Sequence, residues 1–448
     1  MTTYAEKTAR LMADIASAGT SGRPGVGLAK GTSNLFRERA RRSAPRIDLS
    51  HFNRVIGVDN AARLVEAEGM TTFEDLADAT LHLDAMPAVV PQLKSITLGG
   101  AVAGVGIEAT SFRQGLVHDT IVAMDILTAD GRIVTCTADN EHRDLFRGFP
   151  NSYGTLGYAL KLTARTIPVE RHVRVTHARH TDPDRFFAEL AQRCASGETD
   201  FVDGVAFGRD DLVLSSGRFV TDAPQVSDYT YERIYYRSLR EKTVDYLTTR
   251  DYLWRWDTDW FWCSKNVGAQ HPWMRRLLGR RRLNSITYQK IMRWNARWHA
   301  TDALDRLRGV HSESVIQDVD IPLARAAEFL AFLDAEVGIL PIWICPIRAP
   351  DATGGATLYP LPRGTLSVNF GFWDTVVSRD RRPDGFVNRR IEREVSAMGG
   401  IKSLYSESYF TEAEFWSIYD RGAYDALKRR YDPQGALGDL YAKCVLRQ

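Results

Sequence analysis

Four glycines fall within eight residues of one stretch of the chain, between Ser95 and Gly115; they are Gly99, Gly100, Gly104 and Gly106. The stretch lies between apolar residues and a second apolar run at 121–127. Glycine has no Cβ atom, so its backbone can approach a flat or phosphorylated ligand closely and can adopt positive φ. Serine and threonine hydroxyls and backbone N–H groups would then face the ligand, and Arg113 would add charge. The pattern predicts a cofactor-binding segment, with a glycine-rich hairpin inside a sheet as the alternative.

Other kinds of chemistry have weaker support in the sequence. No G-x-S-x-G motif occurs, which argues against a hydrolase, and no G-x-G-x-x-G opens a helix as in a dinucleotide-binding Rossmann fold. His172, His177 and His180 fall on a predicted strand and the loop after it, without the spacing of a metal site. The sequence therefore predicts no bound metal, and any nicotinamide donor would bind transiently.

Composition agrees with an ordinary globular protein. The chain has 448 residues, 44% hydrophobic and 25% charged, and its net charge of +2 does not call for a nucleic-acid partner. The five cysteines lack any C-x-x-C pair, which predicts a reducing compartment. The first 18 residues predict an amphipathic helix and not a signal peptide, and no window has the ~20 apolar residues of a membrane span. We expect a cytoplasmic protein, on the inner face of the membrane at most.

The elements that would position the glycine segment can be read along the chain. Thr72–Leu81 predicts a helix with a threonine cap, and Asp130-Gly131 between two apolar runs predicts a hairpin over 121–137. A second glycine-bearing loop, Ser152–Gly157, precedes a strand at 159–167. Further expected strands are 47–49, 54–58, 64–68, 201–219 (two strands), 315–322, 341–347 and 366–372, and further helices are 182–194, 323–337, 412–419 and 423–431.

Three of these segments, taken in order, resemble the flavoproteins of the vanillyl-alcohol-oxidase/PCMH type. They are Lys30-Gly-Thr-Ser-Asn34, Leu98-Gly-Gly-Ala101 followed by Gly106 and Gly115, and Gly154-Thr-Leu-Gly157 before a strand. Within that superfamily the chain most resembles the delta-24-sterol reductase (seladin) branch, from about residue 50 to its end. The phrases that carry this are Thr97–Gly100, Gly106-Ile-Glu-Ala-Thr-Ser111, Leu127–Gly131, Leu340-Pro-Ile-Trp-Ile-Cys-Pro346 and Phe415-Trp416. Thr32–Phe36 and Phe149–Thr155 look like an actinobacterial subgroup, the reductases of methylene-branched fatty acyl chains in tuberculostearate-type lipids.

The resemblance implies an α+β fold. A PCMH-type FAD-binding domain of two α/β subdomains would span 1–170, an α+β cap domain with an antiparallel sheet 171–400, and a segment returning to the FAD domain 401–448. It implies non-covalent FAD, because the loops lack the His or Cys that carries flavin in related oxidases. The residues implied to bind FAD are Lys30, Gly31, Thr32, Ser33, Asn34, Thr97, Leu98, Gly99, Gly100, Gly104, Gly106, Ile107, Thr110, Ser111, Gly115, Ser152, Gly154, Thr155 and Gly157.

An enzyme of this branch needs an acid. An isolated, electron-rich alkene accepts a hydride from flavin only after protonation to a tertiary carbocation, so a buried carboxyl group must hold a proton near neutral pH. The candidate acids are Glu108, Glu313, Asp318 and Asp320, with His311, Tyr405 and Glu407 in reserve. Each has a structural alternative, because Glu108 could cap a backbone amide and acids alternating on one strand point to both of its faces. Gln317, on the same strand, would hydrogen-bond the flavin ring edge or face outward.

A tryptophan- and arginine-rich segment follows, from Trp254 to Arg282. Such a composition suits either the headgroup region of a membrane or an aromatic cap core with a solvated arginine face. Both interpretations stand at this point, and each can hold for different residues.

The sequence thus predicts an FAD-dependent, NADPH-driven reductase of a carbon–carbon double bond in a lipid. A methylene-branched fatty acyl chain, in a phospholipid and paired with a lipid methyltransferase, is the first substrate to consider, and a sterol side chain is the second. An alcohol or sugar oxidase of the same superfamily is the alternative enzyme. A flavin-bearing accessory protein that presents lipid to the methyltransferase is the non-enzymatic alternative.

Overall fold

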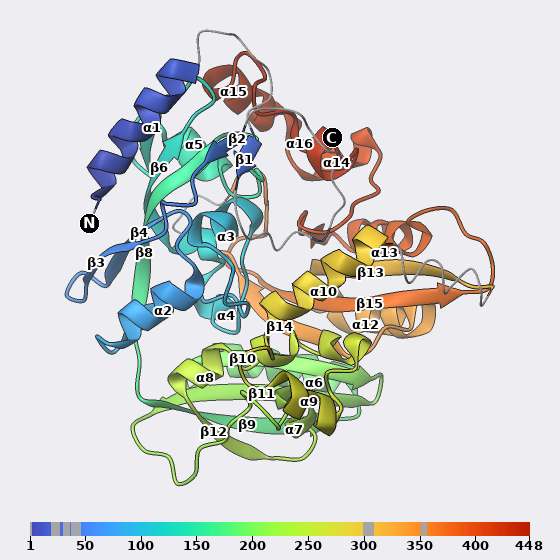
Figure 1. Cartoon of the computed structure of the whole chain (residues 1–448). Coiled ribbons are helices and arrows are strands. Elements are labelled where there is room, and N and C mark those ends of the chain that lie inside the picture. Colours follow the sequence, from blue (N-terminus) through green and yellow to red (C-terminus); the bar gives the residue numbers. More distant parts are fainter. Residues whose placement is uncertain (1, 19–26, 30–35, 37–45, 299–308, 351–355) are drawn as a thin grey trace.

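The computed structural model describes residues 2–18, 27–29, 36, 46–298, 309–350 and 356–448. Figure 1 shows one mixed helix-and-sheet part built from the first third of the chain and a second part built around a larger sheet. The helices at the C-terminus lie beside the first part, above the larger sheet. Lys30, Gly31, Thr32, Ser33 and Asn34, the first predicted FAD loop, lie outside the described residues.

The first part contains an antiparallel sheet with the strand order β3-β4-β8-β6-β7, and β5 pairs antiparallel with β8. Its strands are β3 (Val55–Asp59), β4 (Leu64–Glu68), β5 (Ala85–Pro87), β6 (Ile121–Leu127), β7 (Ile133–Thr137) and β8 (Tyr158–Pro168). The predicted hairpin is β6–β7, and Gly131 takes the φ of +83° that its turn requires. A parallel pair of short strands, β1 (Gly27–Ala29) and β2 (Arg46–Asp48), lies outside this sheet.

The helices described in this part are α1 (Tyr4–Ala18), α2 (Phe73–Leu81), α3 (Leu98–Gly104), α4 (Ser111–Gln114) and α5 (Arg143–Gly148). The predicted helix at 72–81 is α2, with Thr72 as its N-cap accepting from the Asp75 amide. Helix α1 is fixed to the sheet by a buried ion pair, Lys7 Nζ to Glu68 Oε2 at 2.6 Å.

The first half of the glycine stretch is the helix α3, and neither the predicted glycine loop nor the alternative hairpin. Thr97 caps the helix, and Leu98, Ala101 and Val102 bury its apolar side. Glycine serves packing here: a Cβ on Gly99 would stand 2.8 Å from the Gly69 carbonyl oxygen. Glycine's low helix propensity obscured the helix in the sequence.

The second part is built on an eight-stranded sheet with the order β12-β9-β11-β10-β14-β15-β13-β16. Its strands are β9 (His172–His180), β10 (Phe201–Gly208), β11 (Asp211–Val220), β12 (Val244–Thr248), β13 (His311–Pro322), β14 (Ile342–Arg348), β15 (Leu366–Ser378) and β16 (Ile401–Lys402). Its helices are α6 (Pro183–Ala195), α7 (Tyr235–Ser238), α8 (Thr249–Leu253), α9 (Pro272–Leu278), α10 (Ser285–Trp298), α12 (Ala326–Phe332) and α13 (Phe386–Ala397). Together the two sheets confirm the predicted α+β fold class.

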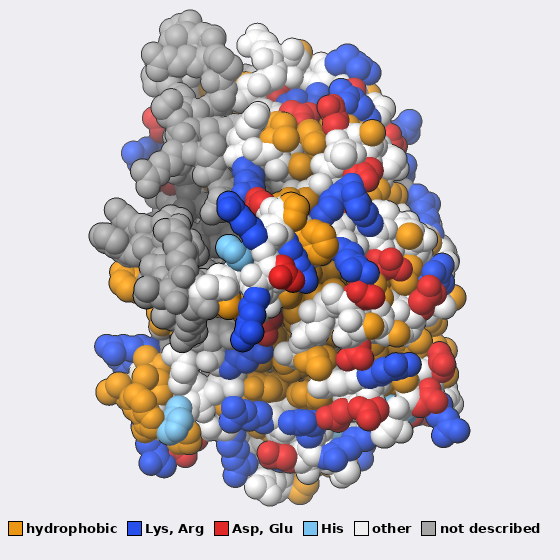
Figure 2. Space-filling view, turned by 90° about the vertical axis from the view of Figure 1, so that its right-hand side faces the viewer, with side chains coloured by type: hydrophobic (Ala, Val, Ile, Leu, Met, Phe, Trp, Pro, Cys, Tyr) orange, Lys and Arg blue, Asp and Glu red, His pale blue; other side chains and the backbone are white. Residues whose placement is uncertain are grey.

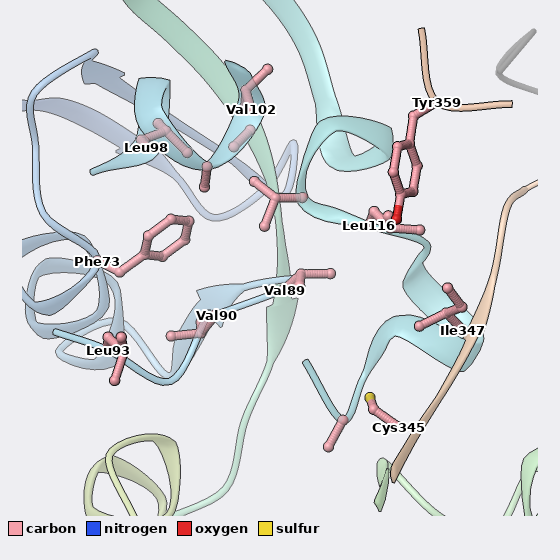
Figure 3. Close-up of a cluster of buried hydrophobic side chains, with 14 of the residues drawn as sticks. Phe73, Val89, Val90, Leu93, Leu98, Val102, Leu116, Cys345, Ile347 and Tyr359 are labelled. Carbon is pink, nitrogen blue, oxygen red and sulfur yellow. The ribbon is translucent and has the colours of Figure 1, made fainter. Parts of the chain in front are cut away.

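The two faces of the eight-stranded sheet carry different side chains. Val315, Val319 and Phe370 belong to a core under α6, α12 and α13. Neighbours of opposite parity, such as Trp343 and Trp373, belong to the core shared with the first part. Figure 3 shows this continuity: Cys345 and Ile347 of β14 lie near Leu116, in the same cluster as Leu98 and Val102 of α3. We call the face that carries Trp343 and Trp373 the inner face.

The C-terminal helices are α14 (Glu412–Ile418), α15 (Arg421–Tyr431) and α16 (Leu440–Cys444). They return to the first part, where Arg430 pairs with Asp144 of α5 at 2.9 Å. Among the residues that the structure describes, no helix is both long and apolar enough to cross a bilayer.

Candidate functional site

The second glycine loop docks on the end of α3. The Tyr153 amide donates to the Ala103 carbonyl at 2.9 Å, and the Tyr153 hydroxyl donates to the Gly104 carbonyl at 2.8 Å. A Cβ on Gly104 would lie 3.2 Å from the Tyr153 ring, so glycine permits this close approach. The structure therefore brings together the two predicted FAD segments that it describes.

Backbone strain gathers at this junction. Val105, Asn151 and Tyr153 have φ values of 65°, 62° and 50°, in a region that residues with a Cβ rarely adopt. Such conformations cost about 1–3 kcal/mol each and cluster at ligand-binding sites. Three of them in two touching loops indicate a shape that is maintained for a ligand.

Two lysines from the C-terminal helices hold the second loop, and sequence reasoning did not find them. Lys443 Nζ donates to the Tyr153 carbonyl at 2.6 Å, and Lys428 Nζ donates to the Thr155 carbonyl at 3.2 Å. They lie 290 and 273 residues from these partners, so nothing in their local sequence points to the loop. Lys428 is also paired with Asp432, so its charge is compensated, and both lysines fix the backbone that is predicted to run along the cofactor.

The start of α3 has its amides engaged by protein. The Leu98 and Gly99 amides donate to the Thr71 and Gly69 carbonyls at 2.9 Å, and the Gly100 amide donates to Thr97 Oγ1 at 3.2 Å. These residues fix α3 against β4, and their amides are not free for a phosphate group. The FAD contact implied for 97–100 therefore cannot be made through these amides.

The other residues of the two glycine loops that are predicted to bind FAD are mostly buried. A Cβ on Gly106 or Gly115 would lie 2.7 Å from protein atoms, and the Thr110 hydroxyl donates to the Ala88 carbonyl at 2.8 Å. Ser111 Oγ accepts from the Glu108 amide at 3.1 Å. Ile107, together with residues 103–105, is partly exposed and lines the accessible edge beyond α3. On the second loop, Gly154 and Gly157 have φ of +76° and +139°, which explains glycine at both positions.

A carboxyl group without a cation lies on the inner face of the sheet. Asp318 projects from β13 opposite Gly371, and a Cβ on Gly371 would lie 2.5 Å from Asp318 Oδ1. That oxygen is shielded from solvent and has no hydrogen-bond partner, while the residue as a whole is partly exposed. Trp373 Nε1 donates to the Tyr405 hydroxyl at 2.9 Å, and that hydroxyl interacts with the Asp318 carboxyl group.

Burial raises the pKa of Asp318 to about 7, and the neighbouring Asp320 adds to the rise, while the Tyr405 hydroxyl opposes it. A carboxyl group with this pKa is about half protonated at neutral pH and largely protonated below it. Asp318 is not fully buried as a residue, so a ligand could approach it, and burial of the carboxyl group lets it keep the proton that a general acid donates.

Tyr405 links this acid to the predicted FAD segments. The Phe36 amide, two residues after the first predicted loop, donates to the Tyr405 carbonyl at 3.0 Å, and the Phe36 and Tyr405 rings meet edge to face. Tyr153 of the second loop is among the groups that raise the pKa of Tyr405, after burial and Asp318. Three segments therefore lie near Tyr405 and Asp318: the end of α3, the second loop, and Phe36 just after the first loop.

Glu108 lies in a different, sealed cluster. Arg255 Nη2 donates to Glu108 Oε1 and to Asp203 Oδ2, both at 2.8 Å, and all three residues are at most 2% exposed. Arg255 is fixed further by the Tyr252 carbonyl at 2.9 Å and by the Tyr252 ring beneath it. Burial raises the pKa of Glu108 to about 7, although Arg255 acts against this.

The remaining candidate acids have structural partners. Asp320 accepts from the Tyr359 hydroxyl at 2.6 Å and from Asn369 Nδ2 at 2.7 Å, and burial raises its pKa to about 6. Glu313 lies on the opposite face of β13, where its carboxylate accepts from the first amides of α13, those of Val387 at 3.0 Å and Asn388 at 2.9 Å. The structure thus gives Glu313 a helix-capping role away from Asp318.

Gln317 is also on the face covered by α13. It is fully buried, and its Nε2 donates to Asn388 Oδ1 at 2.7 Å. The predicted contact with a flavin ring is therefore not supported, because the side chain points away from the inner face.

The tryptophan-rich segment divides into two parts. Trp254, Trp256, Trp260 and Trp262 are at most 5% exposed and belong to the core, as one of the two interpretations predicts. The Phe261 ring packs at a tilt against Trp373 with ring centres 4.3 Å apart, and Trp373 and Asp318 both lie next to Gly371, so this segment covers the inner face near Asp318. Trp273 is 57% exposed and does not belong to that core.

The residues around Asp318 and Tyr153 fit a flavin. Ser152 Oγ and Ser406 Oγ are buried without a hydrogen-bond partner, as is Asp318 Oδ1. A planar ring system with polar edges would satisfy such atoms. The residues that would contact it are Gly104 to Ile107, Ser152, Tyr405 and Ser406. Among the described residues no group of His, Cys, Asp and Glu could hold a metal ion.

Comparison with known proteins defines the class. Residues 2–137 match the family described as "FAD binding domain". Together with the observed α+β fold and the geometry of the glycine loops, this match indicates an FAD-dependent oxidoreductase.

Individual relatives add detail. The chain is 27% identical to the "Delta(24)-sterol reductase" of Pisum sativum over 458 residues, covering 93% of this chain and 79% of that protein. It is 25% identical to the protein of the same name from Homo sapiens over 405 residues, covering 87% and 75%. "Cytokinin dehydrogenase 7" of Oryza sativa subsp. japonica is 27% identical over 148 residues, 32% of this chain and 28% of that protein. The predicted similarity to delta-24-sterol reductases is confirmed, whereas the narrower assignment to the actinobacterial fatty-acyl subgroup is not.

Proposed function

We propose that this protein is an FAD-dependent reductase that saturates an isolated carbon–carbon double bond in the side chain of a sterol or similar branched isoprenoid lipid, with NADPH as electron donor. The similarity to Delta(24)-sterol reductases over 93% of the chain supports this substrate class over the methylene-branched acyl chain. The observation that carries the proposed chemistry is Asp318, an acid without a cation and with a pKa of about 7.

Asp318 would donate the proton. Its carboxyl O–H bond breaks as a new C–H bond forms at the less substituted alkene carbon, which leaves the positive charge on the more substituted carbon. When bound, reduced FAD would supply the hydride that completes the saturated product. Asp318 then regains a proton that comes from solvent, so one proton and one hydride are consumed for each double bond.

The surrounding residues would protect the cation. Trp373 and Phe261 exclude water, which would otherwise add to the carbocation and give an alcohol. Aromatic faces also stabilise a nearby positive charge. Tyr405, oriented by Trp373 Nε1, would keep the Asp318 carboxyl group aligned with the substrate.

The decisive experiment is anaerobic. The FAD-loaded protein is reduced with NADPH, then mixed with a detergent-dispersed Δ24 sterol, and flavin absorbance and product mass are recorded. We expect NADPH to bleach the flavin, and the sterol to restore its colour while gaining two hydrogens. A methylene-branched stearoyl lipid is the comparison substrate, and a faster reaction with it would overturn the proposed substrate class.

The oxidase alternative predicts a different result. Neither alkene would then reoxidise the flavin, whereas oxygen would do so quickly and release hydrogen peroxide. This outcome would contradict the proposed reductase.

A further inference from the structure

The surface formed by α9 and α10 exposes large apolar side chains. Among the described residues thirteen large hydrophobic side chains are exposed, and five of them fall between positions 273 and 294. These five are Trp273 (57%), Leu277 (69%), Ile286 (37%), Ile291 (38%) and Trp294 (61%). Scattered apolar residues need no explanation, but such a concentration on two neighbouring helices marks an interaction surface.

Helix periodicity places these residues on the outer sides of both helices. Trp273 and Leu277 are four residues apart on α9, and Ile286 and Trp294 are eight apart on α10, so each pair shares a helix face. The inner sides are anchored: buried Arg275 pairs with Asp259, and the Tyr288 hydroxyl donates to the Thr258 carbonyl at 2.9 Å. The apolar side chains are therefore held outward by firmly packed helices.

The charge on this surface is positive. The sequence contains no Asp or Glu between Asp259 and Asp302, but nine Lys and Arg residues. Arg276 and Arg280 pair with Glu232 and Asp228 of an earlier segment at 3.3 and 2.8 Å. Arg281, Arg282 and Lys290 are exposed, and within the described part of the chain no ion pair is seen for them.

Figure 2 shows hydrophobic side chains at the surface, with lysine or arginine side chains around them, at its lower left edge. This edge corresponds to the front of Figure 1, where α9 and α10 are drawn. Tryptophan favours the headgroup region of a bilayer, and lysine and arginine are attracted to anionic lipids there.

We propose that the outer faces of α9 and α10, the docking face, bind the surface of an anionic phospholipid bilayer. Trp273, Leu277 and Trp294 insert among the headgroups, and Arg281, Arg282 and Lys290 contact lipid phosphates. The same chain segment includes Phe261, which packs on Trp373 of the inner face, so docking brings a lipid-borne substrate near the site. This last consequence rests on the proposed function, whereas bilayer binding does not.

Vesicle co-sedimentation tests the proposal without substrate or NADPH. The FAD-loaded full-length protein is mixed with phosphatidylcholine vesicles that contain or lack phosphatidylglycerol, in about 0.1 and about 0.5 M salt. We expect binding to the anionic vesicles at the lower salt, and at least about tenfold weaker binding without phosphatidylglycerol or at the higher salt. A protein that stays in the supernatant with anionic vesicles overturns the proposal.

Two surface variants separate the apolar and charged contributions. Trp273→Ser with Leu277→Ser, and Arg281→Glu with Arg282→Glu, should each weaken vesicle binding about tenfold or more. Val377→Ser on β15 is the matched control, because that side chain is 59% exposed outside the docking face. Unchanged FAD content and thermal midpoint show that each variant is folded, and unchanged vesicle binding in both double variants overturns the proposal.

The other partners of such a surface give different results. The protein could instead self-associate or bind single-stranded DNA through this surface, and the same variants would then lose that binding. Either result without vesicle binding would contradict the proposal that the docking face binds a bilayer. With detergent-dispersed sterol the variants should keep their activity and with vesicle-borne sterol they should lose it. If no sterol reacts in either form but vesicle binding behaves as expected, the proposed function fails and the docking face stands.

Discussion

Glu108 and Asp318 are both buried acids with a pKa of about 7, yet their surroundings differ. Glu108 is 1% exposed and shares the Arg255 guanidinium with Asp203. Asp318 has no cation beside it and is only partly buried as a residue, although each of the two carboxyl groups has one oxygen without a hydrogen-bond partner. A raised pKa alone therefore does not identify a proton donor, because access and freedom from a cation must accompany it. We assign the chemical role to Asp318 and a structural role to the Glu108 cluster.

The sharpest test of this comparison is Asp318→Asn. The amide has nearly the same shape but no proton to give, so alkene-driven reoxidation of the reduced flavin should slow by about 10²–10⁴-fold. Reduction of the flavin by dithionite should be unchanged. Stopped-flow absorbance under anaerobic conditions measures both steps. Asp320→Asn is the control, since Asp320 is sealed behind Tyr359 and Asn369, and an equal loss there would remove the special role of Asp318.

Mutation of the Glu108 cluster should change the stability of the fold. Arg255→Leu leaves two carboxyl groups buried without their shared cation, which should lower the free energy of unfolding by about 3–5 kcal/mol. Urea denaturation measures this loss. Arg250→Leu is a control on the neighbouring helix, because its ion pairs with Asp78 and Glu74 are exposed and should contribute about 1 kcal/mol or less. Equal losses in the two variants would contradict the assigned structural role.

The strands and helices around these clusters were largely predictable from local sequence. The Asp130-Gly131 turn fixed the hairpin, and period-2 alternation correctly implied that the acids of β13 divide between two faces. The same alternation could not tell which face is the inner one. Helix α13 covers the opposite face, and its contact with β13 joins the Val387 amide to Glu313, which lies 74 residues earlier in the chain.

The sites themselves depend on contacts between distant residues. Arg255 lies 147 residues from Glu108, and Lys443 lies 290 residues from Tyr153. No spacing rule relates such positions. The sequence could therefore place Glu108 among the candidate acids, but it could not show that the Arg255 guanidinium pairs with its carboxyl group. The helix α3 was missed because glycine weakens its helical pattern, although Thr97 is a recognisable cap.

The pH dependence of the reaction separates the two acids further. Asp318 acts in its protonated form and its pKa is raised to about 7, so alkene-driven reoxidation should be constant below about pH 6 and fall about tenfold per pH unit above about pH 7. Asp318→Asn should abolish this dependence. Single-turnover rates, taken from mildly acidic to mildly alkaline pH, measure the profile. A rate that rises with pH would show that a base, and not an acid, limits the reaction.

Tyr405→Phe should move this profile by a smaller amount. The Tyr405 hydroxyl opposes the rise in the pKa of Asp318, so its removal should shift the midpoint to higher pH, by about one unit or less. The rate at low pH should fall by about tenfold because the carboxyl group is less well oriented. A fall in rate without a shift of the midpoint would mean that Tyr405 only shapes the site.

The smallest effect is expected for Glu108→Gln. Near neutral pH, Glu108 is already about half protonated, and the amide oxygen of glutamine can still accept from Arg255 while Asp203 remains its counterion. The rate of alkene-driven reoxidation should therefore change by less than about threefold, which corresponds to less than about 1 kcal/mol in the barrier. The same stopped-flow measurement that tests Asp318→Asn applies. If the reoxidation rate fell about a hundredfold in Glu108→Gln but not in Asp318→Asn, the proton donor would be Glu108 with its partner Arg255. Asp318 would then have the structural role.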